Sequence, residues 1–450
     1  MIPPKPNARP RNASFLRHFR LFRRDILSAQ PAHLFSAWMA EFKTPFFRSF
    51  LVNDPKLVDI VLKERARDFP KSGRITRGLT GLLGQKSVFL TNGAEWQAQR
   101  RLLDPAFAHG RVRDGFGAMR DAVQAAVLRL EDGPFEAQSF TSHLAADVIF
   151  RTLFSVPITD ERAAQVYAGF QAYQRRQPIV NAAAFLPLLG RLGLRRTGQE
   201  AKAIRTMISE MVATRLQEIA AGTAPDDLAT RIASARDPET GRGFDHDDLV
   251  DQVAIFFLAG HETSASALAW ALYLVARDQE VQGQLQDELD DFPDSPDFSD
   301  LSKLSLTKSV FQETLRLYPP VPMMVREAAC PAIFRGRDVP KGAQIVLSPW
   351  HLHRHERLWE APDAFCPARF GPDATPADKS AARAAYMPFS AGPRVCVGAA
   401  FAMTEGVLSL AMLSRAFAFQ PCTDHVPQPS AQLTLRSANG IHLVAQKRVT

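Results

Sequence analysis

Apolar residues recur at three- and four-residue spacings along much of the chain, as they do in amphipathic and buried helices. The pattern is most regular over 249–275, 304–317 and 401–417. Runs with strand character are short by comparison, for example 345–347 and 440–444. These proportions predict a mainly α fold with small β-sheets.

Stretches rich in Pro, Gly, Asp and Ser interrupt the helical pattern at 291–302 and 371–379. Such clusters are typical of surface connections. Neither stretch separates parts of different composition, and the sequence contains no internal repeat or low-complexity tract. We therefore expect residues 1–450 to form a single domain.

A basic amphipathic pattern occupies 14–27, within the N-terminal segment 1–30. Aromatic and aliphatic side chains fall on one side of the expected helix and arginines surround them: Phe15, Phe19, Phe22 and Ile26, with Arg17, Arg20, Arg23 and Arg24. Helices of this kind dock on their own domain or lie on a membrane surface. Docking is the preferred interpretation, because it is the commoner use of such a helix.

The chain has 450 residues, of which 46% are hydrophobic and 22% are charged, so it can bury a large core. Lysine and arginine outnumber the acidic residues, and the formal net charge is +7. A charge of this sign attracts acidic partners, of which nucleic acid is one class. No zinc-finger, helix-turn-helix or RNA-binding motif accompanies the charge, so we expect an acidic protein partner and no nucleic acid.

Four cysteines, Cys330, Cys366, Cys396 and Cys422, are widely spaced and form no C-x-x-C pair. This spacing predicts a reducing compartment. Arginines interrupt every apolar stretch before Asp25, so the sequence predicts neither a signal peptide nor a transmembrane segment. We expect a cytoplasmic protein.

The strongest chemical signal lies at 389–398, Phe-Ser-Ala-Gly-Pro-Arg-Val-Cys-Val-Gly, directly before a long apolar helix. A thiolate at a helix N-terminus, here Cys396, is stabilised by unbonded backbone N–H groups and by the helix dipole. Gly392 permits a sharp turn with positive φ, and Gly398 lets a flat macrocycle approach the backbone. The combination indicates a thiolate that binds the metal of a planar cofactor.

Two side chains near Cys396 support this interpretation. Arg394 could pair with a carboxylate of the macrocycle, and Phe389 would pack beside the sulfur and limit solvent. The segment resembles the haem-binding loop of the cytochrome P-450 family, Phe-x-x-Gly-x-Arg-x-Cys-x-Gly, and matches all five specified residues. The resemblance implies that Cys396 is the iron ligand of haem b, iron protoporphyrin IX. The usual interpretation of a lone cysteine, a buried structural thiol, fits this context poorly.

A second pair of motifs resembles the same family. Glu313 and Arg316 lie three residues apart on one predicted helix face, and Pro-Ala-Arg369-Phe follows downstream. They resemble the family's Glu-x-x-Arg helix and the loop whose arginine completes a buried triad. The resemblance implies that one carboxylate between two arginines fixes this helix to the loop before the thiolate.

The apolar helix expected from about Asp245 carries Ala259, Gly260, a histidine, Glu262 and Thr263 in its middle. A central glycine and adjacent polar residues are unfavourable in a buried helix. We expect a local widening of the helix there, with room for dioxygen and water. The segment resembles the family's acid-alcohol motif, Ala-Gly-x-Glu-Thr. That likeness implies that the threonine holds water beside dioxygen and that the glutamate supplies protons from solvent.

Further positions resemble haem contacts of the family. Trp96 and Arg100 are four residues apart, so the indole N–H and the guanidinium can face one propionate. Arg326, after a proline-rich turn, resembles another propionate-binding arginine. His353 lies in a family-like stretch, but we expect no haem contact from it.

The resemblance implies a triangular cytochrome P-450 fold, with haem between the helix of Gly260 and the loop of Cys396. The implied reaction is a monooxygenation that inserts one oxygen atom from O2 into carbon. Apolar residues are expected around the substrate: Leu79, Leu82, Leu83, Val88, Phe89, Val321, Pro322, Met323 and Met324. They predict a lipophilic substrate of fatty acid, terpenoid or aromatic class. Arg48 and Arg74 are cations that could stand near an entrance, so a carboxylate anchor is a weaker hypothesis.

No flavin or iron–sulfur segment follows the cysteine loop, so we expect electrons from separate proteins. The net charge favours an acidic 2Fe-2S ferredoxin, served by a ferredoxin reductase, with a flavodoxin-like donor as the alternative. The basic face expected to bind the donor includes Arg101, Arg111 or Arg113. We expect a monomer.

Two other functions stay open at this point. A haem-thiolate peroxygenase or isomerase needs no electron donor, but such enzymes usually lack an acid-alcohol pair like Glu262 and Thr263. A non-catalytic haem sensor or carrier would need no water-binding threonine in its pocket. Steady NADH consumption with substrate and redox partners would separate the three hypotheses.

Overall fold

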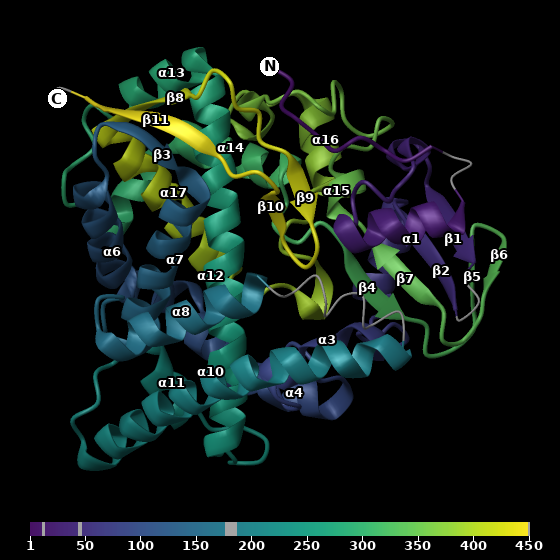
Figure 1. Cartoon of the computed structure of the whole chain (residues 1–450), viewed down its shortest axis with the longest axis horizontal. Helices are drawn as coiled ribbons and strands as arrows, with labels where there is room; N and C mark the ends of the chain where they lie inside the picture. Colours follow the sequence, from purple (N-terminus) through teal and green to yellow (C-terminus); the bar gives the residue numbers. More distant parts are fainter. Residues whose placement is uncertain (11–13, 44–46, 176–186, 449–450) are drawn as a thin grey trace. The chain divides into compact units, whose positions relative to one another are not determined.

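The computed structural model describes residues 1–10, 14–43, 47–175 and 187–448. Helices dominate this part of the chain and small sheets lie beside them (Figure 1), which confirms the expected mainly α fold. The α-helices of the described residues are α1 (Phe15–Arg24), α2 (Pro55–Asp59), α3 (Gly73–Leu83), α4 (Gly93–Leu103), α5 (His109–Asp114), α6 (Phe116–Arg129), α7 (Ala137–Phe154), α8 (Glu161–Arg175), α10 (Pro187–Ala221), α11 (Leu228–Ser234), α12 (His246–Arg277), α13 (Gln279–Leu289), α14 (Ser305–Leu317), α15 (Pro349–Leu352), α16 (Pro376–Ala385) and α17 (Ala399–Ala416). Shorter turns are the 3-10 helices η1 (Ala32–Phe35), η3 (Asp104–Phe107), η4 (Phe298–Lys303), η5 (Pro367–Phe370) and η6 (Gly392–Arg394), and the π-helical turn η2 (Ile60–Glu64).

The described strands form four small sheets. The largest has the order β1-β2-β7-β4, a second has the order β3-β11-β8, and β9-β10 and β5-β6 are antiparallel pairs. The bounds are β1 (Met39–Lys43), β2 (Arg48–Val52), β3 (Gly133–Glu136), β4 (Met324–Glu327), β5 (Ala332–Phe334), β6 (Arg337–Val339), β7 (Gln344–Leu347), β8 (Phe417–Pro421), β9 (Pro429–Ala431), β10 (Leu435–Ser437) and β11 (His442–Lys447). The two strands expected from sequence are therefore present, although the second begins at His442 and not at 440.

The chain divides into two compact units. Unit 1 comprises 1–69, 123–144 and 263–450, and unit 2 comprises 70–122 and 145–262. Every described strand belongs to unit 1, whereas the regular structure described in unit 2 is helical.

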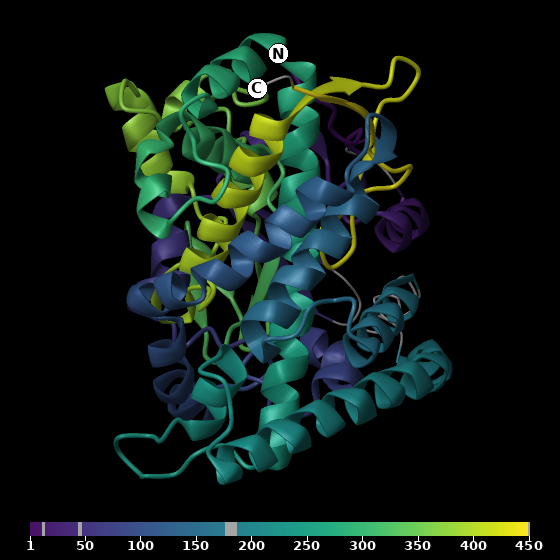
Figure 2. The same cartoon turned by 90° about the vertical axis from the view of Figure 1, so that its left-hand side faces the viewer.

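The core of unit 1 includes the sheet β1-β2-β7-β4. The parallel pairing of β2 with β7 sets Phe50 opposite Ile345 and Val52 opposite Leu347, and all four side chains are fully buried. Elsewhere in this unit, α13 and α14 both pack against α17 (Figures 1 and 2). The apolar periodicity at 304–317 and 401–417 therefore corresponds to helices that bury one another.

The core of unit 2 includes an aromatic cluster on α7, α8 and α12. The ring of Phe257 lies 4.8 Å from that of Phe150 and 4.4 Å from that of Phe170, measured between centroids. The long helix α10, drawn in teal in Figure 2, packs against α8, α3 and α11. The aromatic contacts explain why Phe257 belongs to the apolar pattern of α12.

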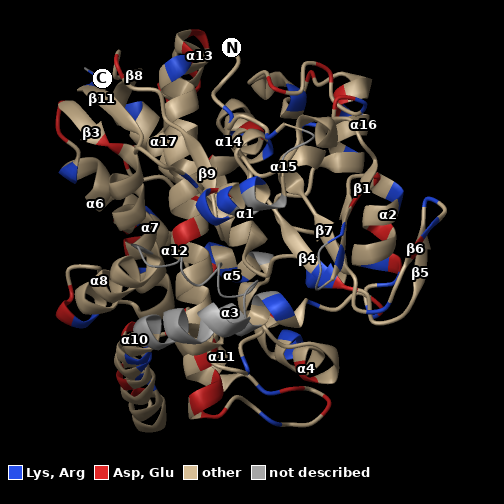
Figure 3. Cartoon of the chain, turned by 45° about the vertical axis from the view of Figure 1, so that its right-hand side comes forward, with Lys and Arg blue, Asp and Glu red and all other residues tan. Residues whose placement is uncertain are grey.

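The basic N-terminal pattern forms α1, capped by Ser14, and Figure 3 shows its exposed arginines in blue. Directly after the helix, Ile26 is buried and donates a backbone hydrogen bond to Ala431 on β9. The carboxylate of Asp25 accepts the N–H of the same alanine at 2.8 Å. The end of the segment is therefore fixed on unit 1. No described helix combines the length and the apolar composition needed to cross a membrane.

The stretches 291–302 and 371–379, which are rich in Pro, Gly, Asp and Ser, are only partly surface connections, because each also contains helical residues. Residues 291–302 run into η4, and 371–379 contain the first turn of α16, which begins at Pro376. Residue propensities alone do not predict that α16 begins at Pro376, because proline is favoured at the first helical position as well as in loops.

Candidate functional site

The cysteine loop at 389–398 is a closed turn between α16 and α17. The N–H of Cys396 donates to the carbonyl of Phe389 at 2.9 Å, and Gly392 has a φ of +68°. A Cβ atom on that glycine would lie 2.0 Å from the carbonyl oxygen of Leu62, so no other residue fits. The positive-φ turn expected from sequence is therefore confirmed, and contact with η2 adds a reason for it.

The thiol of Cys396 is exposed at the start of α17. Gly398 caps the helix, and a Cβ atom added there would meet no described atom within 4 Å. The first helical residues are apolar yet only half-buried, whereas the following turns are buried; the half-buried residues are Ala399, Ala400, Phe401, Ala402 and Met403. An accessible thiol beside an accessible apolar surface fits a flat apolar macrocycle bound through sulfur.

Arg326 lies on β4 in unit 1 and is only 6% exposed. The one hydrogen bond described for its side chain runs from Nη1 to the carbonyl of Val325 at 3.3 Å, and no carboxylate of the described residues forms an ion pair with it. Burial lowers the pKa of Arg326 to about 10. A buried guanidinium with so few partners is unfavourable by itself. It fits an anionic group of a bound ligand, such as a haem propionate.

Arg394 and Phe389 are both half-buried in the cysteine loop, with Arg394 in η6. Trp96 and Arg100 belong to α4 in unit 2, and the guanidinium lies 5.8 Å from the centroid of the indole ring. The two side chains therefore face the same way. Arg100 also donates from Nε to Asp104 at 2.6 Å, an ion pair that the four-residue spacing of the motif did not indicate.

The helix α12 is α-helical without interruption from His246 to Arg277. The expected widening near Gly260 is therefore wrong. A Cβ atom at Gly260 would lie 2.5 Å from Cδ1 of Ile149, so the glycine allows α7 and α12 to approach closely within unit 2. Close helix packing is the physical reason for glycine at this position.

One face of α12 stays accessible although most of the helix is buried. It carries Phe256, Ala259, Gly260 and Thr263, which are separated by three or four residues. Glu262, next to this face, is buried and only 3% exposed. The helix thus presents small residues and a hydroxyl on one side, with a buried carboxyl group adjacent to them.

An interaction that the sequence did not reveal joins α12 to α17 within unit 1. The hydroxyl of Ser264 donates to Oε2 of Glu405 at 2.6 Å. Glu405 is fully buried, and burial raises its pKa to about 8, against a smaller lowering by the Ser264 hydrogen bond. The serine directly follows Thr263 in the chain.

The predicted triad is assembled in unit 1 by α14 and η5. Arg316 donates to both oxygens of Glu313, from Nε at 2.6 Å and from Nη2 at 2.7 Å. Nε of Arg369 lies 3.6 Å from Oε1 of the same carboxylate, and the N–H of Cys366 donates to that oxygen at 2.9 Å. Nη1 of Arg369 also reaches Asp378 at 3.1 Å, a partner that sequence reasoning missed.

His353 extends this network toward the cysteine loop. Its Nδ1 lies 3.2 Å from the carbonyl of Arg316, and its Nε2 accepts the N–H of Met387 at 2.9 Å. Burial lowers the pKa of His353 to about 3, with a further lowering by the charge of Arg316. The neutral imidazole therefore connects α14 to the chain two residues before Phe389.

The cations expected to bind a redox partner belong to unit 2. Arg101 pairs with Asp237 at 2.8 Å and with Glu239 at 3.1 Å, and Arg111 pairs with Asp114 at 3.2 Å. The charge of these two arginines is therefore largely balanced. Arg113 is exposed.

The apolar residues expected around the substrate differ in burial. In unit 2, Leu79, Leu82, Leu83 and Val88 are buried, and Phe89 is half-buried. In unit 1, Pro322 is buried, whereas Val321, Met323 and Met324 are half-buried. Leu82 and Leu83 are completely inaccessible, so they act in the core of unit 2.

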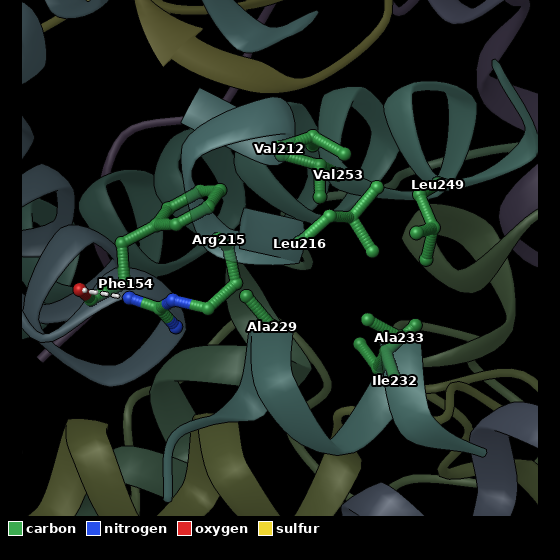
Figure 4. Close-up of a pocket in the computed structure, with 9 residues that line it drawn as sticks. All are labelled: Phe154, Val212, Arg215, Leu216, Ala229, Ile232, Ala233, Leu249 and Val253. Atoms are coloured by element: carbon green, nitrogen blue, oxygen red, sulfur yellow. Dashed lines mark hydrogen bonds between the residues drawn. The ribbon is translucent and has the colours of Figure 1, made fainter. Parts of the chain in front are cut away.

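A small apolar pocket lies in unit 2 among α7, α10, α11 and α12 (Figure 4). It is lined by Phe154, Val212, Arg215, Leu216, Ala229, Ile232, Ala233, Leu249 and Val253. Arg215 donates to the carbonyl of Phe154 at 2.9 Å and pairs with Asp227, so its charge is already satisfied. Among the described residues, none of those predicted for the functional site lines this pocket.

Comparison with known proteins agrees with the geometry of the cysteine loop. The family model described as Cytochrome P-450 matches residues 33–444. Cytochrome P-450 4A14 of Rattus norvegicus is 30% identical over 439 residues, which cover 91% of this chain and 83% of the rat protein. Cyclooctat-9-en-7-ol 5-monooxygenase of Streptomyces melanosporofaciens is 32% identical over 411 residues, with 89% and 86% covered. Cyclooctatin synthase of the same organism is 29% identical over 413 residues, again with 89% and 86% covered. This chain therefore belongs to the cytochrome P-450 family.

Proposed function

We propose that the chain is a haem-thiolate monooxygenase that inserts one oxygen atom from O2 into an apolar small molecule, with Cys396 as the iron ligand. The observation that carries the proposal is the closed loop that presents an exposed thiol at the start of α17. Haem is the cofactor of the family. When bound, it supplies the iron at which dioxygen is activated, and a thiolate ligand favours cleavage of the O–O bond.

Several side chains would hold the cofactor. The dipole of α17 favours the thiolate form of Cys396, and Phe389 would limit solvent beside the sulfur. Gly398 leaves the backbone open to close approach. Arg326 and Arg394 would pair with propionates, since a buried guanidinium gains most from a carboxylate. Trp96 and Arg100 on α4 would add an indole N–H and a third guanidinium group.

Residues of α12 would control the protons. The hydroxyl of Thr263 would orient a water molecule, and Glu262 would pass protons to it from solvent. Ala259 and Gly260 leave space on the same helix face because they have small side chains or none. Glu313, Arg316 and Arg369 would act at a distance, by keeping the chain that leads to the cysteine loop in place.

The substrate class follows from the apolar side chains expected around it. A lipophilic molecule of fatty acid, terpenoid or aromatic class suits them. One relative is named for the monooxygenation of cyclooctat-9-en-7-ol. Arg48 forms an ion pair with Glu41 at 2.8 Å, so its guanidinium is less available to bind a substrate carboxylate.

Electrons would come from an acidic 2Fe-2S ferredoxin and its reductase, because the chain has a net charge of +7. Arg101, Arg111 and Arg113 would take part in docking, the first two from ion pairs with acidic neighbours. None of the four cysteines forms a disulfide in the described part of the chain, which suits the cytoplasm. The two units would work as one haem domain and as a monomer.

Spectroscopy and turnover test the proposal together. The reduced carbon monoxide complex should show the red-shifted absorption of a thiolate ligand. A panel of fatty acids, terpenoids and aromatic ethers should contain compounds that displace iron-bound water and change the spin state. With such a compound, ferredoxin, reductase and NADH should give steady nicotinamide consumption and an oxygenated product. Product formed with peroxide alone, and none with the electron donor, would favour a peroxygenase instead.

A further inference from the structure

Two buried hydroxyl groups bind α12 to other elements just after Thr263. The hydroxyl of Ser266 donates a hydrogen bond to the carbonyl of Leu435 on β10. The hydroxyl of Thr141 on α7 donates to the carbonyl of Ala265 at 2.9 Å. All five residues belong to unit 1, so both bonds lie within one compact unit.

The hydrogen bond of Ser266 is unusual for a serine inside a helix. Serine and threonine there commonly return their hydroxyl to the carbonyl one turn earlier, as Thr314 of α14 does with Val310 at 2.8 Å. The hydrogen bond described for Ser266 leaves its own helix, and its acceptor is held in turn, since the N–H of Leu435 donates to the carbonyl of Pro320 at 2.9 Å. Serine has a lower helix propensity than alanine, so the contact with β10 explains the hydroxyl better than helix formation does.

The contacts of residues 264–266 surround the helix. Successive residues of an α-helix are rotated by about 100°, so side chains two positions apart leave the helix on nearly opposite sides. Ser264 therefore reaches α17 on one side and Ser266 reaches β10 on the other, while the carbonyl of Ala265 meets α7. Contacts on opposite sides fix the rotation of α12 about its own axis.

This rotation decides where the hydroxyl of Thr263 lies. An oxygen about 4 Å from the axis of a helix moves by about 0.7 Å when the helix turns by about 10°. A displacement of about 1 Å at a reacting group can lower a rate about 10²-fold. Thr263 directly precedes the held segment and belongs, like Cys396, to unit 1. Small rotations of α12 are therefore large on the scale that matters for orienting a water molecule.

We propose that Ser266 and Thr141 are positioning residues for the monooxygenation, which fix the rotation of α12 in unit 1 and thereby the direction of the Thr263 hydroxyl. The inference rests on the proposed function. Neither residue has to transfer a proton or touch the substrate for this role. Thr141 should contribute less than Ser266, because its single hydroxyl proton is shared with the carbonyl of Ala137, which lies 2.8 Å away.

The test compares Ser266→Ala and Thr141→Val with two matched controls. Valine has nearly the shape of threonine but no hydroxyl. Thr152→Val removes another buried hydroxyl of α7, which bonds within its own helix to the carbonyl of Val148 at 2.6 Å. Ser409→Ala removes a buried hydroxyl of α17 that has no hydrogen-bond partner among the described residues.

Coupling is measured with the compound of the fatty acid, terpenoid and aromatic ether panel that shifts the spin state most. All four variants should keep the red-shifted carbon monoxide band, because the thiolate is unchanged. A displaced hydroxyl costs less than a missing one, so we expect product per NADH to fall about fivefold in Ser266→Ala and about twofold in Thr141→Val. Both controls should match the parent.

Infrared spectroscopy of the reduced carbon monoxide complex gives a second readout, which does not depend on turnover. The C–O stretching frequency responds to polar groups on the distal side of the haem. It should shift in Ser266→Ala and Thr141→Val, as it should in Thr263→Ala, and stay unchanged in the controls.

The double variant of Ser266→Ala and Thr263→Ala separates positioning from general destabilisation. If Ser266 acts through the hydroxyl of Thr263, nothing is left for it to position once that hydroxyl is gone. The double variant should therefore couple as Thr263→Ala does, which is the non-additivity expected of two residues that act as one unit. A further fall by the same factor as in Ser266→Ala alone would overturn the inference.

Coupling and C–O stretching frequencies equal to those of the parent in both Ser266→Ala and Thr141→Val would also overturn it and make the two hydroxyls packing groups. If Ser266→Ala does not fold, Thr141→Val measured against Thr152→Val decides by the same criteria. Absence of the red-shifted band in the parent itself would instead overturn the proposed function. The two failures are therefore distinguishable.

Discussion

Two fully buried glutamates of unit 1, Glu313 on α14 and Glu405 on α17, have opposite surroundings. Glu313 is held by two arginines and a backbone N–H, whereas one serine hydroxyl is the described partner of Glu405. A buried carboxyl group with this set of partners holds the neighbouring helix and loop in place, because removing one partner leaves buried charge without a counter-charge. A carboxyl group with few partners keeps its proton. Burial alone therefore does not distinguish the two acids, but the number and charge of their partners do.

Arg326 belongs with Glu405 in this comparison. Its buried guanidinium has one described hydrogen bond, to the carbonyl of Val325. Groups that the protein leaves poorly satisfied are the ones that can bind a ligand or transfer a proton. In the Glu313 network, in contrast, the carboxyl group and the two arginines pair with one another.

Cys396→Ser tests the accessible end of α17 and should have the largest effect. The protein should fold, because the side chain is exposed, but the red-shifted band of the reduced carbon monoxide complex should be lost completely, since a hydroxyl is a poor substitute for a thiolate. Cys422→Ser is the matched control and should keep the band. Retention of the band in Cys396→Ser would refute the ligand assignment.

Glu313→Gln tests the network that Glu313 forms with Arg316 and Arg369. It leaves two buried guanidinium groups without their common carboxylate, which typically costs about 3 to 5 kcal/mol of the free energy of unfolding. We expect a lower thermal unfolding midpoint and loss of haem during purification. Glu405→Gln should instead retain haem, and it should not lower the unfolding midpoint at neutral pH, because the amide has no charged form that would favour the unfolded chain. Equal stability of the two variants would contradict the distinction between the two acids.

Thr263→Ala removes a hydroxyl from the accessible face of α12 without touching the thiolate. Substrate affinity should change by no more than a few fold, and NADH consumption should continue. A hydrogen bond made only in the reacting complex is worth about 10² in rate, so product per NADH should fall steeply while peroxide accumulates. Full coupling in this variant would make Thr263 structural and favour the peroxygenase or isomerase hypothesis.

The raised pKa of Glu405 predicts that the free energy of unfolding depends on pH. Its pKa is about 8 in the folded chain and 4.5 as the ordinary value, so the folded state binds the proton more tightly. The stability that this group contributes is complete below about pH 4.5 and is lost as the pH rises toward 8. Relative to Glu405→Gln, which does not titrate, the parent should lose up to about 1.4 kcal/mol per pH unit in this window. Denaturant unfolding at several pH values measures the difference, and parallel curves would contradict the raised pKa.

Arg326→Gln should have the smallest effect on the fold and a selective effect on the cofactor. The variant removes a buried charge that has no described carboxylate partner, so the unfolding midpoint should hold or rise. A charge-assisted hydrogen bond is worth about 1.5 to 3 kcal/mol, so haem should dissociate about tenfold faster or more. Transfer of haem to apomyoglobin measures this rate. A large loss of stability with unchanged haem release would assign Arg326 to the core instead.

Much of the architecture was predictable because periodicity and turn chemistry are local. The pattern at 249–275 became part of α12, and Gly392 has the positive φ that its motif requires. The triad was predictable only as a resemblance, since Glu313 and Arg369 are far apart in sequence. The widening of α12 was a wrong inference from Gly260, because the sequence does not show that Ile149 packs there.

The sequence by itself determined the family, the cysteine loop and the mainly α fold, because each depends on residue types at short, fixed spacings. Only the tertiary structure decided which charges are satisfied. In the folded chain Arg100 donates a hydrogen bond to Asp104, whereas the side chain of Arg326 has one described hydrogen bond, to a backbone carbonyl. The fold also places Ser264 within hydrogen-bond distance of Glu405, which is 141 positions away in sequence. Ion pairing and burial depend on distances between helices, and those distances are set by packing of the whole core and not by any local pattern.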